Sequence, residues 1–361
     1  MSVPTLNEIA QIPELPPSAP AIWANPVLTY VNSMYQSVSQ RRSALGLPSP
    51  GTIENINKEV SKDVFLTPYF FTGLRADVSK SFSMNPAFQV SHSLSMGSPV
   101  LPSYAFAAFY ATDNAFLHGN FEGDKSLSGR AQFGWNPANT SKANFQIAPG
   151  QPAMLQLEHD FLGSDFSLNF KALNPSLLSG SFTGVLVGSL FQSLTSHLSL
   201  GLEAMYSSQS SLYPPDAAVS YYARYATPNW IASAQVQATG SITASFWRKV
   251  ADKVEAGIES TVGVNAQQAM MMGTPPTLEG VTTIGAKYEF RQSMFRGQVD
   301  SNGKVSCLVE RRVLPVVSLT FAGELDQFKN QARVGLGLQL EAGGEEVFEQ
   351  QQMMEQQQQM L

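Results

Sequence analysis

Apolar and polar residues alternate along residues 68–341, in segments of about ten residues separated by Gly, Pro, Asn, Asp and Ser. In one such segment, Phe166 and Leu168 are apolar, whereas Ser167 and Asn169 between and beside them are polar. Successive side chains of a β-strand point to opposite faces. A repeat of two residues therefore predicts a series of strands, each with one apolar and one polar face.

The alternation gives 19 candidate strands. They begin near residues 69, 87, 104, 115, 127, 142, 153, 165, 182, 196, 218, 229, 241, 253, 280, 293, 303, 316 and 330. If each strand has about ten residues, about four remain for each connection. Sixteen strands would also fit. Bacterial single-chain barrels have even strand numbers and a mitochondrial porin has 19, so the strand number bears on the compartment.

Composition indicates which way the two faces point. Only 14% of residues are charged, against roughly 25% in a soluble domain, while 43% are hydrophobic. A soluble all-β binding protein would turn the polar faces to water and should carry more charge on them; it stays open as an alternative. A closed transmembrane β-barrel explains the pattern better, because apolar residues then face lipid and uncharged polar residues face the lumen.

Several other classes are disfavoured. No run approaches the roughly 20 apolar residues of a spanning helix, and the N-terminus lacks a secretory signal pattern. The single Cys307 allows no internal disulfide and no paired-cysteine metal motif. Lys and Arg are nowhere clustered, which argues against nucleic acid. Adjacent His159 and Asp160 would point to opposite faces of a strand, so we expect no catalytic pair there. The sequence has no GxSxG segment and no cluster of metal ligands, so we expect no enzyme, no metal and no cofactor.

The ends differ from the alternating region. Residues 1–49 form a Pro-rich arm, in which Leu28, Val31 and Tyr35 recur at the spacing of a short helix. Residues 342–361 are rich in Gln, Glu and Met and are expected to be disordered. Residues 68–341 make the barrel.

Residues 50–67 are the second helix candidate. Thr52 can cap the first turn, and the apolar side chains Ile53, Ile56 and Val60 share one face. Lysines and acids are mixed on its other face, which is unlike a membrane-surface anchor. We therefore expect a helix that leans on the barrel wall from inside the lumen.

Three runs closely resemble one known family, the channel-forming barrel subunit of the mitochondrial outer-membrane protein translocase (the TOM complex), in its fungal form. They are residues 50–55 (Pro-Gly-Thr-Ile-Glu-Asn) with Glu59-Val60, residues 70–77 (Phe-Phe-Thr-Gly-Leu-Arg-Ala-Asp) and residues 85–92 (Asn-Pro-Ala-Phe-Gln-Val-Ser-His). The resemblance covers about residues 50–341.

This resemblance implies a 19-stranded barrel of the mitochondrial porin superfamily, in the mitochondrial outer membrane, with both termini in the intermembrane space. It implies a channel for unfolded precursor polypeptides with basic presequences. The implied partners are a single-span receptor, small single-span subunits and a second copy of the barrel, together with membrane lipid. A metabolite-selective porin of the voltage-dependent anion channel type remains the alternative, although such a pore should have an excess of Lys and Arg in its lumen.

Alternation assigns eight acids to the lumen, where the resemblance implies contact with presequences. They are Asp77, Glu158, Asp160, Asp165, Glu203, Glu255, Glu259 and Glu324. The same parity turns five basic residues inward: Arg75, Arg130, Lys171, Arg224 and Arg333. Acids could therefore either attract basic presequences through weak, salt-sensitive interactions or pair with bases across strands. Both readings remain open from the sequence.

The last candidate strand contains a polar residue, a glycine and two apolar residues at the spacing of Arg333, Gly335, Leu338 and Leu340. This arrangement resembles the family's barrel-assembly signal. A glycine-containing strand edge can approach another strand closely, as insertion into a membrane would require. Plain alternation would produce much of the same spacing.

Overall fold

The computed structural model describes residues 46–176, 182–208, 214–264 and 277–343. Its internal contacts divide the chain into two units, Met1–Leu47 and Pro48–Leu361. All the strands among the described residues lie in the second unit. The helix expected within residues 1–49 and the disorder expected within residues 342–361 fall almost entirely outside the described residues, except that Ala342 ends the last strand.

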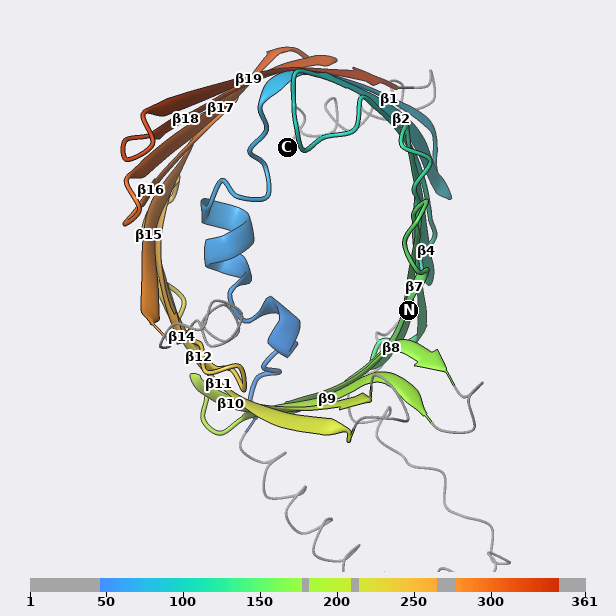
Figure 1. The fold of residues 1–361 in the computed structure, drawn as a ribbon, viewed down its shortest axis with the longest axis vertical. Helices are drawn as coiled ribbons and strands as arrows, with labels where there is room; N and C mark the ends of the chain where they lie inside the picture. Colours follow the sequence, from blue (N-terminus) through green and yellow to red (C-terminus); the bar gives the residue numbers. More distant parts are fainter. Residues whose placement is uncertain (1–45, 177–181, 209–213, 265–276, 344–361) are drawn as a thin grey trace, which may run out of the picture. The chain divides into compact units, whose positions relative to one another are not determined.

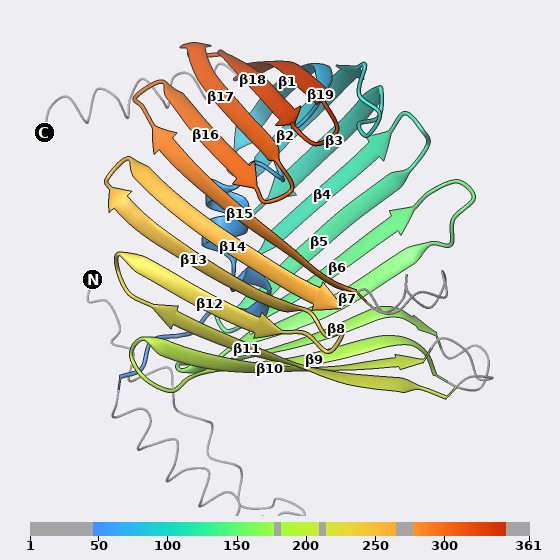
Figure 2. The same ribbon diagram turned by 60° about the vertical axis from the view of Figure 1, so that its left-hand side comes forward.

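The strands of the second unit form one closed sheet of 19, shown end-on in Figure 1 and from the side in Figure 2. Their bounds are β1 Gly73–Met84, β2 Ala87–Met96, β3 Tyr104–Ala111, β4 Ala115–Glu122, β5 Leu127–Asn136, β6 Asn139–Ile147, β7 Met154–Leu162, β8 Phe166–Ser176, β9 Thr183–Ser193, β10 Leu198–Ser208, β11 Asp216–Ala226, β12 Trp230–Val236, β13 Ile242–Ala251, β14 Val254–Val264, β15 Leu278–Glu289, β16 Ser293–Asp300, β17 Lys304–Leu314, β18 Val317–Asp326 and β19 Gln331–Ala342. The predicted fold class and strand number are confirmed.

The first strand begins later than the alternation predicted, at Gly73 instead of near residue 69. The preceding residues turn inward: Leu66 and Phe71 pack against Leu308 and Ala322 on the inner face of β17 and β18. Burial of these two apolar side chains therefore stabilises the chain more than extending β1 back to residue 69 would.

Consecutive strands pair antiparallel, and the barrel closes by one parallel pairing between β1 and β19. The register there runs from Gly73 opposite Gly335 to Lys80 opposite Ala342. An odd number of strands makes the first and last strands parallel. Closure pairs the two edge strands of the sheet. Their facing backbone N–H and C=O groups then bond to each other and are not left without a hydrogen bond in the hydrocarbon core of a membrane.

The apolar face of the strands points away from the lumen. Leu190, Leu202, Phe321 and Leu338 are among the many large apolar side chains exposed on the described surface. A soluble binding protein would bury this face, so that alternative is wrong for this chain. No helix within the described stretches is long and apolar enough to span a bilayer.

An inner segment, residues 48–72, runs inside the ring of strands (Figure 1, blue). The single helix expected after a Thr52 cap is wrong in form. The segment instead has a short 3₁₀ turn, η2 (Ile53–Asn55), and a π-helical turn, η3 (Glu59–Val64). Thr52 caps no backbone amide, because its hydroxyl accepts a hydrogen bond from the side chain of Asn55 at 2.9 Å.

The inner segment begins, and β19 ends, at the same open end of the barrel. The hydroxyl of Ser193, at the end of β9, donates to the carbonyl of Pro48 at 2.8 Å. Strands β9 and β19 run in the same direction, since strands alternate in direction and both numbers are odd. The inner segment therefore enters at the side where β19 ends at Ala342, and crosses the lumen to reach Gly73 on the other side.

Candidate functional site

The inner segment is held to the lumen face by apolar side chains that meet glycines. A Cβ at Gly201 would lie 3.0 Å from Ile53, one at Gly257 would lie 3.2 Å from Val60, and one at Gly285 would lie 2.8 Å from Phe65. These glycines on β10, β14 and β15 leave hollows for the larger side chains. Because packed interiors tolerate little added volume, the hollows fix the position of the segment along the wall.

Two of the three predicted pore-helix residues share one buried cluster. Ile53 and Ile56 pack with Phe191 and Tyr222, whereas Val60 packs with Val64 and Phe65 further along the segment. The residues predicted to lean on the wall therefore do so, on opposite sides of the break between η2 and η3.

Polar contacts secure the segment at the same break. The side-chain oxygen of Asn57 accepts hydrogen bonds from Ser233 at 2.5 Å and Ser245 at 3.1 Å, and its amide donates to Glu259 at 3.4 Å. Glu59 pairs with Arg224 at 2.5 Å. Wall groups on β12, β13 and β14 thus take the hydrogen-bonding capacity of the Asn57 side chain, which attaches the segment to the wall between η2 and η3.

A compact charge cluster, the β7 cluster, joins the wall to the start of the segment. Lys142 lies 3.4 Å from Glu158 and 2.6 Å from Asp160, and the amide of Asn169 donates to both carboxylates. Lys171 lies 3.9 Å from Glu158. Only 2% of the Glu158 side chain and 6% of the Asp160 side chain are exposed.

Glu54 of the inner segment completes the β7 cluster. Its carboxylate is 3.9 Å from the ammonium of Lys142 and 3.7 Å from that of Lys171. Two lysines therefore hold three carboxylates together. Buried ions need such partners, since each loses its hydration.

The remaining predicted acids also have side chains on the lumen face, but with different neighbours. Asp77 pairs with Arg75 at 2.8 Å, Glu324 pairs with Arg333 at 3.7 Å, Glu255 accepts from the indole of Trp247 at 3.4 Å, Glu203 accepts from the hydroxyl of Tyr222 at 3.1 Å, and Glu259 accepts from Asn57 as above. Asp165 is buried just before β8, and the hydroxyl of Ser164 donates to it at 3.5 Å. The structure thus brings Glu158 and Asp160 together and keeps the others apart.

The four residues of the candidate assembly signal lie on β19 at the seam of the barrel. Gly335 and Arg333 are on the lumen face, whereas Leu338 and Leu340 are on the outer face with 37% of each exposed. The carbonyl of Phe71 occupies the place where a Cβ on Gly335 would be, and the ring of Phe71 lies 2.9 Å from such a position on Gly337. Both glycines are therefore required by the inner segment at the seam.

The described part of the chain contains no group of His, Cys, Asp and Glu that could hold a metal ion.

A family model for the eukaryotic porins matches residues 49–335. This chain belongs to the eukaryotic porin family.

Within that family, this porin is similar to subunits of mitochondrial import. It is 53% identical to the mitochondrial import receptor subunit TOM40 of Saccharomyces cerevisiae, over 96% of this chain and 94% of the relative. It is 46% identical to the tom40 subunit of Neurospora crassa, over 90% and 93%, and 26% identical to the human TOM40 homologue, over 81% and 79%. A solved mutant porin of Rh. blastica is similar over 67% of this chain and 93% of its own, with a TM-score of 0.41 and 10% identity.

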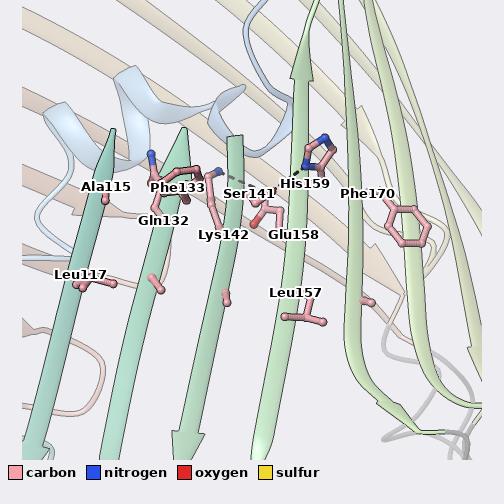
Figure 3. Close-up of a pocket in the computed structure, with 13 residues that line it drawn as sticks. Ala115, Leu117, Gln132, Phe133, Ser141, Lys142, Leu157, Glu158, His159 and Phe170 are labelled. Carbon is pink, nitrogen blue, oxygen red and sulfur yellow. Dashed lines mark hydrogen bonds and ion pairs between the residues drawn. The ribbon is translucent and has the colours of Figure 1, made fainter. Parts of the chain in front are cut away.

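This porin also has a hollow of about 480 Å³ on β4 to β8, lined largely by outward apolar side chains such as Leu117, Leu157 and Phe170 (Figure 3). At one side of it, the ring of His159 is hydrogen-bonded to Ser141 at 3.0 Å. The neighbouring Asp160 binds Lys142 on the lumen face instead. The two adjacent residues therefore lie on opposite faces, as alternation predicted.

Sequence reasoning missed the residues that position the inner segment. Asn57, Lys142 and the glycines Gly201, Gly257 and Gly285 carried no distinguishing signal within an alternating strand or a polar helix face. The inward parity of Lys142 could have been obtained by counting from Glu158 across a strand, but only with the register known.

Proposed function

We propose that this porin is the protein-conducting channel of a mitochondrial outer-membrane translocase and passes unfolded precursor polypeptides across that membrane. The observation that carries the proposal is the 53% identity to yeast TOM40 over nearly the full length of both chains. The yeast relative is a mitochondrial import receptor subunit. An import role suits a closed barrel whose lumen is lined by polar and charged side chains of both signs.

The lumen chemistry suits a chain that must pass without binding tightly. Conduction requires sites that are favourable enough to enter and weak enough to leave. Acids with neutral partners, such as Glu203 and Glu259, supply this kind of attraction for a basic presequence. The other predicted acids contribute less in this proposal. Arg75 and Arg333 offset the charge of Asp77 and Glu324, and Lys142 offsets that of Glu158 and Asp160. Asp165 is buried, and Lys249 and Lys287 lie opposite Glu255 on the neighbouring strands.

Assembly and partners complete the proposal. Arg333, Gly335, Leu338 and Leu340 on β19 serve as the signal by which an insertion machine recognises the last strand. The outer apolar face accommodates a single-span receptor, small single-span subunits, a second copy of the barrel and lipid. The side on which the inner segment enters and β19 ends is assigned to the intermembrane space.

The metabolite-selective porin is less favoured. Charges of both signs face the lumen, and the ion pairs Arg75–Asp77, Arg224–Glu59 and Arg333–Glu324 leave little excess of positive charge in the part of the wall that the structure describes. An anion-selective pore is expected to have such an excess.

The proposal is tested by replacing the resident channel of fungal mitochondria with this protein. Import of a precursor with a cleavable presequence into the depleted mitochondria should be restored, and purified protein in planar bilayers should show current blockades by a basic presequence peptide. A scrambled peptide with the same charge but no amphipathic face is the control for the blockades. Restored membrane insertion without restored import would overturn the proposal.

A further inference from the structure

Arg296 is a buried base on the lumen face of β16. Only 6% of the residue is exposed, and its guanidinium carbon lies 3.9 Å from the centre of the Tyr69 ring, which belongs to the inner segment. Such stacking fixes the plane of the guanidinium and covers one of its faces. The charge is therefore held in one orientation.

This buried guanidinium has no anionic partner among the described residues. No described carboxylate lies within 4.0 Å of it, and its Nε is enclosed without a hydrogen-bond acceptor. Arg224 gives the contrast, because its Nε is also enclosed but its terminal amino group meets Glu59 at 2.5 Å. A buried charge without a partner is unfavourable, which is why such groups in proteins are paired or bind a ligand.

Arg296 lines a hollow of about 320 Å³ between the inner segment and the strands at the seam. Its lining is mainly polar and includes Thr320 and Gln339, which can donate hydrogen bonds. Two acids also line it. Asp77 is already paired with Arg75, whereas Glu310 has no ion pair with any residue that the structure describes, and it reduces the attraction of the hollow for anions.

We propose that Arg296 forms an oxyanion-binding site in the lumen, which takes a phosphate or a carboxylate against the fork of its guanidinium. The planar fork matches the two oxygens of such a group, Tyr69 orients it, and Thr320 and Gln339 donate to the remaining oxygens. With Glu310 at the same hollow, the site is weak and sensitive to salt. The oxyanion comes either from free phosphate or from an acidic side chain of a polypeptide in the channel.

The test uses the whole protein in planar bilayers at constant ionic strength, with two probes in separate arms: inorganic phosphate replacing chloride, and a capped acidic peptide. Either probe should change the single-channel current with a saturable dependence on concentration. Arg296→Gln should weaken that dependence roughly tenfold, as expected for the loss of one charge-assisted hydrogen bond. Arg130→Gln, which removes an exposed base of β5 that alternation turns into the lumen, is the matched control and should respond as wild type.

A response to phosphate alone assigns the site to free anions, and a response to the peptide alone assigns it to polypeptide carboxylates. If Arg296→Gln fails to fold, Tyr69→Leu decides, because it keeps the charge and should weaken binding several-fold by releasing the guanidinium. The proposal is overturned if wild type responds to neither probe, if the variants at residues 296 and 69 respond as wild type, or if Arg130→Gln has the same effect. None of these results affects the proposed import function.

Discussion

The acids of the β7 cluster and the acids on β10 and β14 face the same lumen but have different neighbours. Glu158 and Asp160 lie almost wholly buried between Lys142, Lys171 and the amide of Asn169. Glu203 and Glu259 are less buried and accept hydrogen bonds only from neutral groups among the described residues. Facing the lumen therefore does not make a carboxylate available to a passing chain.

The cause of the difference is the register of the neighbouring strands. Lys142 and Lys171 lie opposite Glu158 on β6 and β8, whereas Ser245 and Thr283 lie opposite Glu259 on β13 and β15. The inner segment then places Glu54 beside both lysines of the β7 cluster, which makes that cluster part of its attachment. On β14 it contributes only the neutral amide of Asn57. The same alternating strand pattern thus produces a structural charge cluster in one place and unneutralised acids in another.

The largest effect is expected from Lys142→Met, which leaves two buried carboxylates without their main partner. Breaking a buried ion pair costs about 3–5 kcal/mol. The temperature at which the detergent-solubilised barrel loses its compact form on electrophoresis should fall markedly. Lys58→Met, at an exposed position of the inner segment, is the control and should leave it unchanged. Wild-type heat stability of Lys142→Met would show that the β7 cluster is not structural.

A second large effect should come from Leu338→Arg. The alternation that turns the acids into the lumen also turns Leu338 to the lipid. An Arg on the lipid face near the midplane costs about 2–4 kcal/mol. Membrane integration, followed by resistance to carbonate extraction, should fail. The adjacent Gln339→Arg places the charge in the lumen and should integrate. Equal integration of both variants would refute the assignment of faces on β19.

The comparison of the two acid groups is sharpened by neutralising each pair separately. Glu203→Gln with Glu259→Gln should weaken binding of a basic presequence peptide by about threefold to tenfold at low salt, because each exposed interaction contributes a few tenths to about one kcal/mol. Glu158→Gln with Asp160→Asn should change it by less than about twofold. Peptide residence times in single-channel records measure the binding to each double variant. A larger loss of binding from the Glu158 and Asp160 changes than from the Glu203 and Glu259 changes would contradict the difference between the two acid groups.

The smallest effect is expected at the exposed pair Arg333–Glu324, where 54% of the arginine side chain is exposed. Exposed ion pairs contribute about 0–1 kcal/mol. Arg333→Gln should therefore leave heat stability almost unchanged, and any loss of assembly would then report on recognition of β19 and not on folding. A large loss of heat stability would show that this pair belongs with the β7 cluster.

The sequence by itself determined the barrel. A repeat of two residues fixes which side chains share a face, and the scarcity of charge indicates that the apolar face meets lipid. Because these properties are local and repeated along the chain, 19 strands could be counted, and all but the first begin within three residues of the prediction. The inward parity of Glu158, Glu259 and Arg224 follows from the same repeat.

Only the tertiary structure decided which of these side chains meet. The partners of the β7 cluster come from β6, β7, β8 and the inner segment, and they are brought together by the register of neighbouring strands. The attachment of the inner segment through Asn57 depends on serines of β12 and β13, more than 170 residues away in the chain. Such contacts depend on positions across the closed sheet, which no local pattern of hydrophobic and polar residues contains.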